Sequence, residues 1–303
     1  MEVVSPVLAD IPTDWENVVD VLSILRNNFR LFVPNSCGFH IHIAKGNEKL
    51  PLHLLRKVVV LMACAESMIF SLCHPVRKER LWSRPIMGEW SPLHENYEKG
   101  ARLQVTPDFW LYIPLHPGSN PRLLGALKKL WMANTGRRLQ RLLKPDIGKC
   151  CISLSKCDFD SAVDTEYNAT VEFRFLEGTL DPELIVRWGQ LTIALFKFAD
   201  IAPLEAWPVF LNTVLQCQPS GRCDISALGS FLSLLGLSDD FNLWADRVVE
   251  MSELEEHKGQ KDRRGEHQRP LSRIEDSQIN ALRSDLCQRE ITLPCLAAKK
   301  GVA

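Results

Sequence analysis

The chain has 303 residues, of which 46% are hydrophobic and 24% charged, values that exclude a collagenous, a wholly disordered or a polytopic membrane protein. Its 36 Lys and Arg nearly balance its 37 Asp and Glu, so no overall field would hold nucleic acid or an anionic membrane. The ten cysteines form no compact framework, and the first residues do not resemble a secretory signal. We therefore expect a cytoplasmic protein with free thiols and with no nucleic-acid or membrane partner.

Hydrophobic periodicity and capping signals divide much of the chain into strands and helices. A capping-box pattern from Thr13 to Glu16 predicts the start of the first helix, and Asp181 followed by Pro182 predicts the start of a later one. The predicted elements in chain order are a strand over 1–5, a helix over 14–32, a strand over 39–43, a helix over 51–72, a helix over 123–131, a strand over 150–155, a strand over 170–176, a helix over 182–200 and two or three helices within 204–251.

Two stretches depart from this periodicity. Residues 73–121 are rich in Pro, Gly, His, Trp and charge and are longer than an ordinary connection, so we expect a loop region that serves a binding or lid function. Residues 252–303 begin with a charged run that has almost no apolar residues, so we expect this segment to be a mostly disordered tail.

Two of the predicted strands place polar side chains on one face and apolar side chains on the other. His40 and His42 share a face of the strand over 39–43, and Glu172 and Arg174 share a face of the strand over 170–176. If these faces meet, the imidazoles and the carboxylate offer ligands for a divalent cation, and the guanidinium offers a fixed charge for a phosphate. The pattern also allows both faces simply to meet water. We expect the two strands to lie within reach of each other in one sheet, with the helices over 14–32, 51–72 and 182–200 packed on its other face.

Three segments in the same order carry a more specific signal: Glu2–Pro6 (EVVSP), Ser36–His42 (SCGFHIH) and Val171–Asp181 (VEFRFLEGTLD). They resemble the signature segments of the amidoligase family, which is part of the carboxylate-amine ligase and glutamine synthetase superfamily, and are nearest to its filamentous fungal versions. The resemblance covers residues 1–202. It implies an α+β fold with a glutamine synthetase-like sheet, helices packed on one face of that sheet, and further C-terminal helices.

The resemblance implies a division of the chain into three parts. We expect an amidoligase-like catalytic core over 1–203, a helical extension over 204–251 and the charged tail over 252–303.

The resemblance also implies chemistry, namely ATP-dependent joining of a carboxylate to an amine through an acyl phosphate. The cofactors would be ATP and Mg²⁺ or Mn²⁺, and the substrates would be small-molecule or peptide carboxylates and amines. Carried over by position, Glu2, His40, His42 and Glu172 would be metal ligands, and Arg174 would hold phosphate or the substrate carboxylate. Glu172 and Arg174 are thus the expected catalytic residues. His42 can instead orient a carboxylate or bond a ligand.

The segment after the long helix resembles an arginine- and aromatic-containing segment of the same family. Arg77, Arg80 and Arg84 are candidate contacts for phosphate or carboxylate, and the alternative is a basic surface cluster. Glu177 is either a further ligand or a solvated acid at the end of its strand.

The sequence departs from the family at its start, because the family's first strand carries a Glu-x-Glu pair and lies upstream of the segment with which this chain begins. We therefore expect a chain that is incomplete at its N-terminus, binds metal-nucleotide weakly and turns over little ATP. Two functions stay open: an ATP-dependent amidoligase, which is inactive as written if it needs the missing carboxylate pair, and a catalytically degenerate relative that binds a ligand or partner. A cupin-type oxygenase also uses a His-x-His strand, but the long helix that follows disfavours it.

Overall fold

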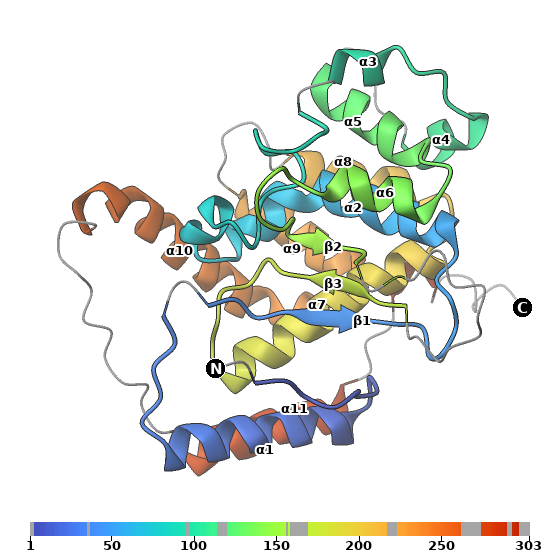
Figure 1. Ribbon diagram of the computed structural model, residues 1–303. Helices are drawn as coiled ribbons and strands as arrows, with labels where there is room; N and C mark the ends of the chain where they lie inside the picture. Colours follow the sequence, from blue (N-terminus) through green and yellow to red (C-terminus); the bar gives the residue numbers. More distant parts are fainter. Residues whose placement is uncertain are drawn as a thin grey trace, which may run out of the picture.

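The computed structural model is a mixed α+β structure in which helices surround a small antiparallel sheet (Figure 1). The structure describes residues 3–34, 37–94, 97–113, 120–155, 157, 169–216, 223–261, 274–289 and 293–296. The elements in chain order are α1 (Pro12–Asn28), β1 (Ile41–Ile43), α2 (Leu52–Ser71), η1 (Pro75–Glu79), α3 (Tyr97–Ala101), α4 (Pro107–Tyr112), α5 (Pro121–Trp131), α6 (Gly136–Leu143), β2 (Ile152–Ser153), β3 (Val171–Phe173), α7 (Pro182–Ile201), α8 (Ala206–Gln216), α9 (Ile225–Leu234), η2 (Ser238–Asp240), α10 (Phe241–Lys261) and α11 (Asp276–Gln288).

The sheet has the strand order β1-β3-β2, and both pairings are antiparallel. β1 pairs directly with β3 in a register that sets His42 opposite Glu172. The ladder continues beyond the strands through an isolated bridge between Gly38 and Glu177. The predicted proximity of the histidine strand and the glutamate strand is therefore confirmed, although each strand is shorter than the sequence pattern indicates.

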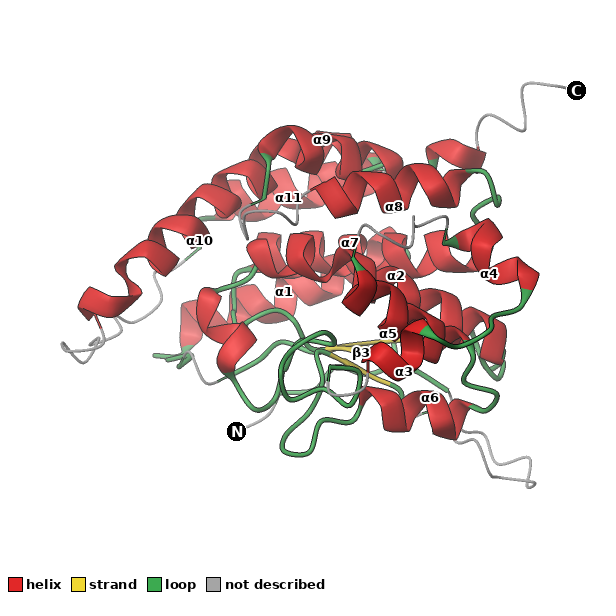
Figure 2. Cartoon of the chain, turned by 90° about the horizontal axis from the view of Figure 1, so that it is seen from above, coloured by secondary structure: helices red, strands yellow, loops and turns green. Residues whose placement is uncertain are grey.

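α2 and α7 form the layer of helices behind the sheet, and α8 and α9 lie behind that layer (Figures 1 and 2). The apolar face of β3 supplies the contact, because Val171, Phe173 and Phe175 are fully buried. The rings of Phe70 on α2 and Phe175 lie 4.9 Å apart. The predicted packing of these two helices on the sheet is confirmed, and α7 begins as predicted with Asp181 as N-cap and Pro182 in its first turn.

α1 does not pack on the sheet, which corrects the prediction for the first helix. It contacts α7 and α11 instead, so α7 separates it from the strands (Figure 1). Its bounds also differ from the predicted 14–32, and the predicted capping box is absent. Pro12 occupies the first turn after Ile11, which makes no side-chain cap. Proline fits this place because the first amide of a helix has no partner within the helix.

The predicted strand over 1–5 is wrong for residues 3–5, which lie outside every strand of the structure. Residues 1 and 2 are outside the described residues. A strand needs a neighbour to take up its backbone hydrogen bonds, and here no strand pairs with this segment.

In its described residues, the region expected to be loop-rich, 73–121, contains three short helices, η1, α3 and α4. α6 is an additional helix that the periodicity did not predict. Its N-cap, Thr135, accepts a hydrogen bond of 3.1 Å from the amide of Arg138. Short helices of this kind bury only a few side chains each, so their apolar signal in the sequence is weak.

The segment expected to be a mostly disordered tail is partly helical, which corrects that expectation. α10 continues to Lys261, and α11 packs on α1 through Ile279, Leu282 and Leu286. These three apolar residues recur at helical spacing within a charged segment, and the overall composition conceals them. The proposed boundaries between the three parts of the chain stay predictions.

In the ranges that the structure describes, no helix has both the length and the apolar character that crossing a membrane requires.

Candidate functional site

The candidate site is a cluster of His40, His42, Glu172 and Arg174, here called the His-Glu-Arg cluster. One carboxylate oxygen lies at its centre: Glu172 Oε1 is 3.5 Å from His40 Nδ1 and 3.7 Å from His42 Nε2. Arg174 donates a hydrogen bond from Nη1 to the same oxygen. The structure thus brings together four side chains that the sequence placed on the polar faces of two strands.

The β1–β3 register explains this convergence, because residues opposite each other in an antiparallel pair project to the same face. His42 is paired with Glu172. Arg174 lies two residues after Glu172, so its side chain projects to the same face of the sheet. The polar face does not simply meet water, since Glu172 and Arg174 are 5% and 9% exposed. The loop after η1 covers part of it, with the carbonyl of Trp82 accepting a 2.9 Å hydrogen bond from Arg174 Nε.

The two imidazoles differ in their surroundings. Burial lowers the pKa of His40 to about 4, helped by the positive charge of Arg174 and opposed by the charge of Glu172. His40 is therefore neutral at pH 7 and can accept or donate a hydrogen bond according to its tautomer. His42 is more exposed, and its Nδ1 lies 3.1 Å from the hydroxyl of Thr170.

The three candidate arginines occupy different environments. Arg77 is almost completely buried, and its guanidinium contacts backbone carbonyls rather than open space. Arg80 is exposed at the end of η1. Arg84 lies with its guanidinium 4.8 Å from the ring centre of Trp90, and its Nε is buried without a partner among the described residues. The three arginines therefore do not share one kind of environment.

Both carboxylate oxygens of Glu177 have partners in the structure. Its Oε2 accepts a 2.9 Å hydrogen bond from the amide of His74, and its Oε1 pairs with Arg247 of α10. The sequence could not indicate Arg247, because 70 residues separate it from Glu177 and no local pattern marks it. Glu2, the remaining predicted ligand, lies outside the described residues.

The described residues do not fit a magnesium site. They contain no group of three or more His, Cys, Asp or Glu side chains arranged to hold a metal ion. The His-Glu-Arg cluster offers one carboxylate, which already pairs with Arg174, and two nitrogen ligands. Mg²⁺ prefers oxygen ligands in octahedral geometry, so the cluster alone does not provide the set it needs.

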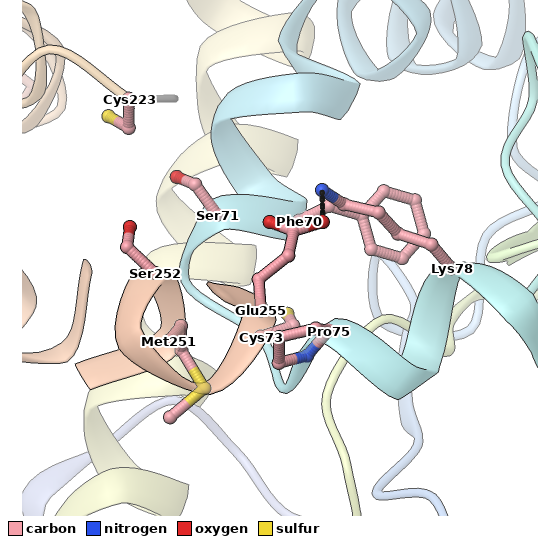
Figure 3. A pocket seen from close by; sticks show the side chains of 9 residues that line it. All are labelled: Phe70, Ser71, Cys73, Pro75, Lys78, Cys223, Met251, Ser252 and Glu255. Carbon is pink, nitrogen blue, oxygen red and sulfur yellow. Dashed lines mark ion pairs between the residues drawn. The ribbon is translucent and has the colours of Figure 1, made fainter. Parts of the chain in front are cut away.

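A pocket lies between α2, η1 and α10 (Figure 3). It is lined by Phe70, Ser71, Cys73, Pro75, Lys78, Cys223, Met251, Ser252 and Glu255. Its free space accommodates about one water molecule. Lys78 and Glu255 face each other across it at 3.9 Å. No residue of the His-Glu-Arg cluster lines this pocket, and it is too small for a substrate.

Residues 1–109 match a family model described as "Putative amidoligase enzyme". The match confirms the resemblance to the amidoligase family for this part of the chain, including His40, His42 and the three candidate arginines. Glu172 and Arg174 lie beyond the matched residues and join the site through the pairing of β3 with β1. Neither the curated proteins nor the solved structures searched include a match to this chain.

Proposed function

We propose that the chain acts as an amidoligase that joins a carboxylate to an amine with the consumption of ATP. The family match over residues 1–109 supports the class of enzyme. The observation that carries the proposal is the convergence of His40 from the matched segment with Glu172 and Arg174 on one sheet face. In this proposal the small sheet and its covering helices are a reduced version of the glutamine synthetase-like architecture.

The proposal assigns the anionic group to Arg174. Its hydrogen bonds to Glu172 and to Trp82 engage Nη1 and Nε, and no described residue accepts a bond from Nη2. A guanidinium held at two of its nitrogens in this way presents Nη2 at a fixed angle, which suits a phosphate or carboxylate oxygen. Glu172 orients the guanidinium and keeps its charge balanced while no ligand is bound.

In this proposal the neutral imidazole of His40 accepts the proton that the incoming amine loses. An amine must lose a proton when it attacks an acyl phosphate, and a neutral imidazole within reach can accept that proton. The low pKa of His40 keeps it unprotonated at pH 7 but makes it a weak base. Proton transfer through His40 would therefore be late, when the nitrogen has already bonded to the carbonyl carbon and become acidic.

ATP and Mg²⁺ or Mn²⁺ enter this proposal through the family resemblance alone. Because the described residues do not fit a magnesium site, we derive no step through the cation. The substrates in the proposal are a small-molecule or peptide carboxylate and an amine.

The proposal is tested with the purified chain, ATP, a panel of carboxylates and hydroxylamine, which converts an acyl phosphate into a stable hydroxamate. We expect carboxylate-dependent hydroxamate formation and ADP release at a low rate, in keeping with the expected weak binding of metal-nucleotide. Glu172→Gln and Arg174→Lys should each lower this rate at least tenfold, because each removes a hydrogen bond to a charged group, which contributes about 1.5–3 kcal/mol. Arg283→Lys, which changes an exposed pair between α11 and α1, serves as the control.

The outcomes separate the candidate functions. Nucleotide binding and hydroxamate formation that are equal in the wild type and in both cluster variants would exclude this site. Ligand binding without any product would favour the degenerate relative, and the absence of both would reject the amidoligase proposal.

A further inference from the structure

Arg77 is the least exposed charged side chain among the described residues, at 1% of its surface. Each of its three nitrogens donates to a backbone carbonyl: Nε to Phe175 at 3.1 Å, Nη1 to Cys37 at 3.3 Å and Nη2 to Arg174 at 2.8 Å. A phosphate could reach this guanidinium only by displacing buried carbonyls, which would then lose their partners at a cost of about 1–3 kcal/mol each. The contacts therefore favour a role in holding the backbone over a role in binding an anion.

The three carbonyls belong to the two strand segments that carry the His-Glu-Arg cluster. Cys37 lies three residues before His40, and Phe175 follows Arg174 directly. These segments also pair with each other, since the amide of Phe39 donates to the carbonyl of Leu176 at 3.1 Å. One guanidinium therefore joins the approach to β1 and the exit from β3, where His40 and Arg174 are attached.

Gly38 provides the space for this arrangement. A Cβ at this position would lie 2.6 Å from Arg77 Nη2 and 2.9 Å from His40 Nε2, both closer than real Cβ contacts. Gly38 is not among the glycines with a positive φ, so its backbone conformation does not require glycine. Glycine is needed at position 38 because the guanidinium of Arg77 and the ring of His40 both occupy the space that a side chain would fill.

η1, which carries Arg77, is also fixed at its other side. Glu177 accepts from the amide of His74, which precedes η1, and pairs with Arg247 of α10. Arg247 in turn donates from Nε to the carbonyl of Leu72 at 2.7 Å. Arg77 thus extends from an anchored helix, so its position can define the position of the strands it contacts.

We propose that Arg77 and Gly38 are positioning residues for the His-Glu-Arg cluster. Arg77 fixes the backbone on both sides of the cluster, and the gap at Gly38 sets the place of the His40 ring, so that His40 and Arg174 face the same ligand. This inference rests on the proposed function for the identity of that ligand, whereas the arrangement itself can be tested without activity.

The test compares Gly38→Ala and Arg77→Lys with Gly229→Ala and Arg56→Lys. Gly38→Ala brings its Cβ against the guanidinium of Arg77 and the ring of His40, so it should displace both side chains. Gly229→Ala adds a methyl group 3.3 Å from the ring of Phe241 in another layer. Arg56→Lys removes a similar guanidinium fork, which donates from two nitrogens to the carbonyl of Ala133.

The first measurement is the set of imidazole signals in ¹H–¹³C NMR spectra. Gly38→Ala and Arg77→Lys should shift the ring signals of His40 and leave those of His53, which contacts Tyr112 and Trp131 elsewhere, unchanged. The two control variants should leave the signals of His40 in place. If the His40 signals are unchanged in both Gly38→Ala and Arg77→Lys, the inference is overturned, whatever the protein's activity.

The second measurement is the affinity for inorganic tripolyphosphate by calorimetry, with folding verified by circular dichroism. We expect Gly38→Ala and Arg77→Lys each to lower the affinity about tenfold, as is typical when a residue that supports a binding side chain is changed. The control variants should show no loss of affinity. Equal losses in the controls would indicate general destabilisation and overturn the inference. If the wild type binds no tripolyphosphate, the anion site of the proposed function fails, and the NMR result alone decides the positioning role.

Discussion

At the scale of single residues, the buried carboxylate of Glu66 shows how tertiary contacts change the chemistry of a side chain. Glu66 lies in the middle of α2 and accepts hydrogen bonds from the amides of Ile86 and Met87, and Cys151 Sγ lies 3.6 Å away. Burial raises its pKa to about 7, although the two amide donors oppose this shift. The sequence shows only one acid interrupting an apolar helix, and it does not show the loop that the acid holds.

Glu66 should make the stability of the protein depend on pH. Its pKa is higher in the folded chain than the ordinary value of 4.5, so its contribution is fully present below pH 4.5 and is lost as the pH rises through 7. Glu66→Gln, which cannot ionise, should remove this loss. Urea unfolding between pH 5 and 8 measures it, and parallel curves for the wild type and the variant would contradict the expectation.

At the scale of elements, the local sequence predicts most helices, but it does not predict which elements they pack against. α2 and α7 appear close to their predicted bounds because long apolar stretches and a strong N-cap define them. The partner of α1 depends instead on one glycine of α7, Gly189. A Cβ there would lie 2.2 Å from Cη2 of Trp15, so the indole of α1 packs directly against the α7 backbone.

Gly189→Ala should therefore separate α1 from α7. We expect it to destabilise the protein by about 1–3 kcal/mol through overpacking, even though alanine favours a helix by about 1 kcal/mol over glycine. Gly229→Ala in α9 has a looser contact and should be neutral or stabilising. Thermal unfolding of the two variants provides the comparison, and a Gly189→Ala variant at least as stable as the wild type would exclude the close contact.

At the scale of the whole molecule, a buried ionic network fixes the last described helix to the core. Asp240 of η2 is 3% exposed and contacts Arg187 of α7 at 3.3 Å and Arg289, just after α11, at 2.7 Å. Arg187 also pairs with Asp285 of α11 at 2.6 Å. Segments about a hundred residues apart are joined in this way.

Asp240→Ala should weaken the attachment of α11 to the core, because it removes the carboxylate that Arg187 and Arg289 share. The expected loss is about 1.5–3 kcal/mol of unfolding free energy, the range for hydrogen bonds to charged groups, because Arg187 and Arg289 keep Asp285 as a second partner. Asp20→Ala removes the exposed pair with Arg283 and should cost less than about 1 kcal/mol. Equal costs in urea unfolding would show that the network does not hold α11.

The candidate site illustrates how far sequence reasoning extends. The alternation around His40 and Glu172 was enough to predict which side chains share a face, and the signature segments indicated that the two strands belong to one site. The positions of Arg77 and Glu177 were open from the sequence. Arg77 is held by backbone carbonyls and Glu177 by Arg247 of α10. Such contacts between distant residues produce no periodic pattern in the sequence.

The sequence by itself determined the resemblance to the amidoligase family, the helices with continuous apolar faces and the polar faces of two strands. Only the tertiary structure decided that α7 separates α1 from the sheet, that α11 packs against α1, and that Glu172 pairs with Arg174 within reach of both histidines. The physical reason is the range of the forces involved. Periodicity and capping act within a few residues, whereas burial and ion pairing depend on which distant segments come together.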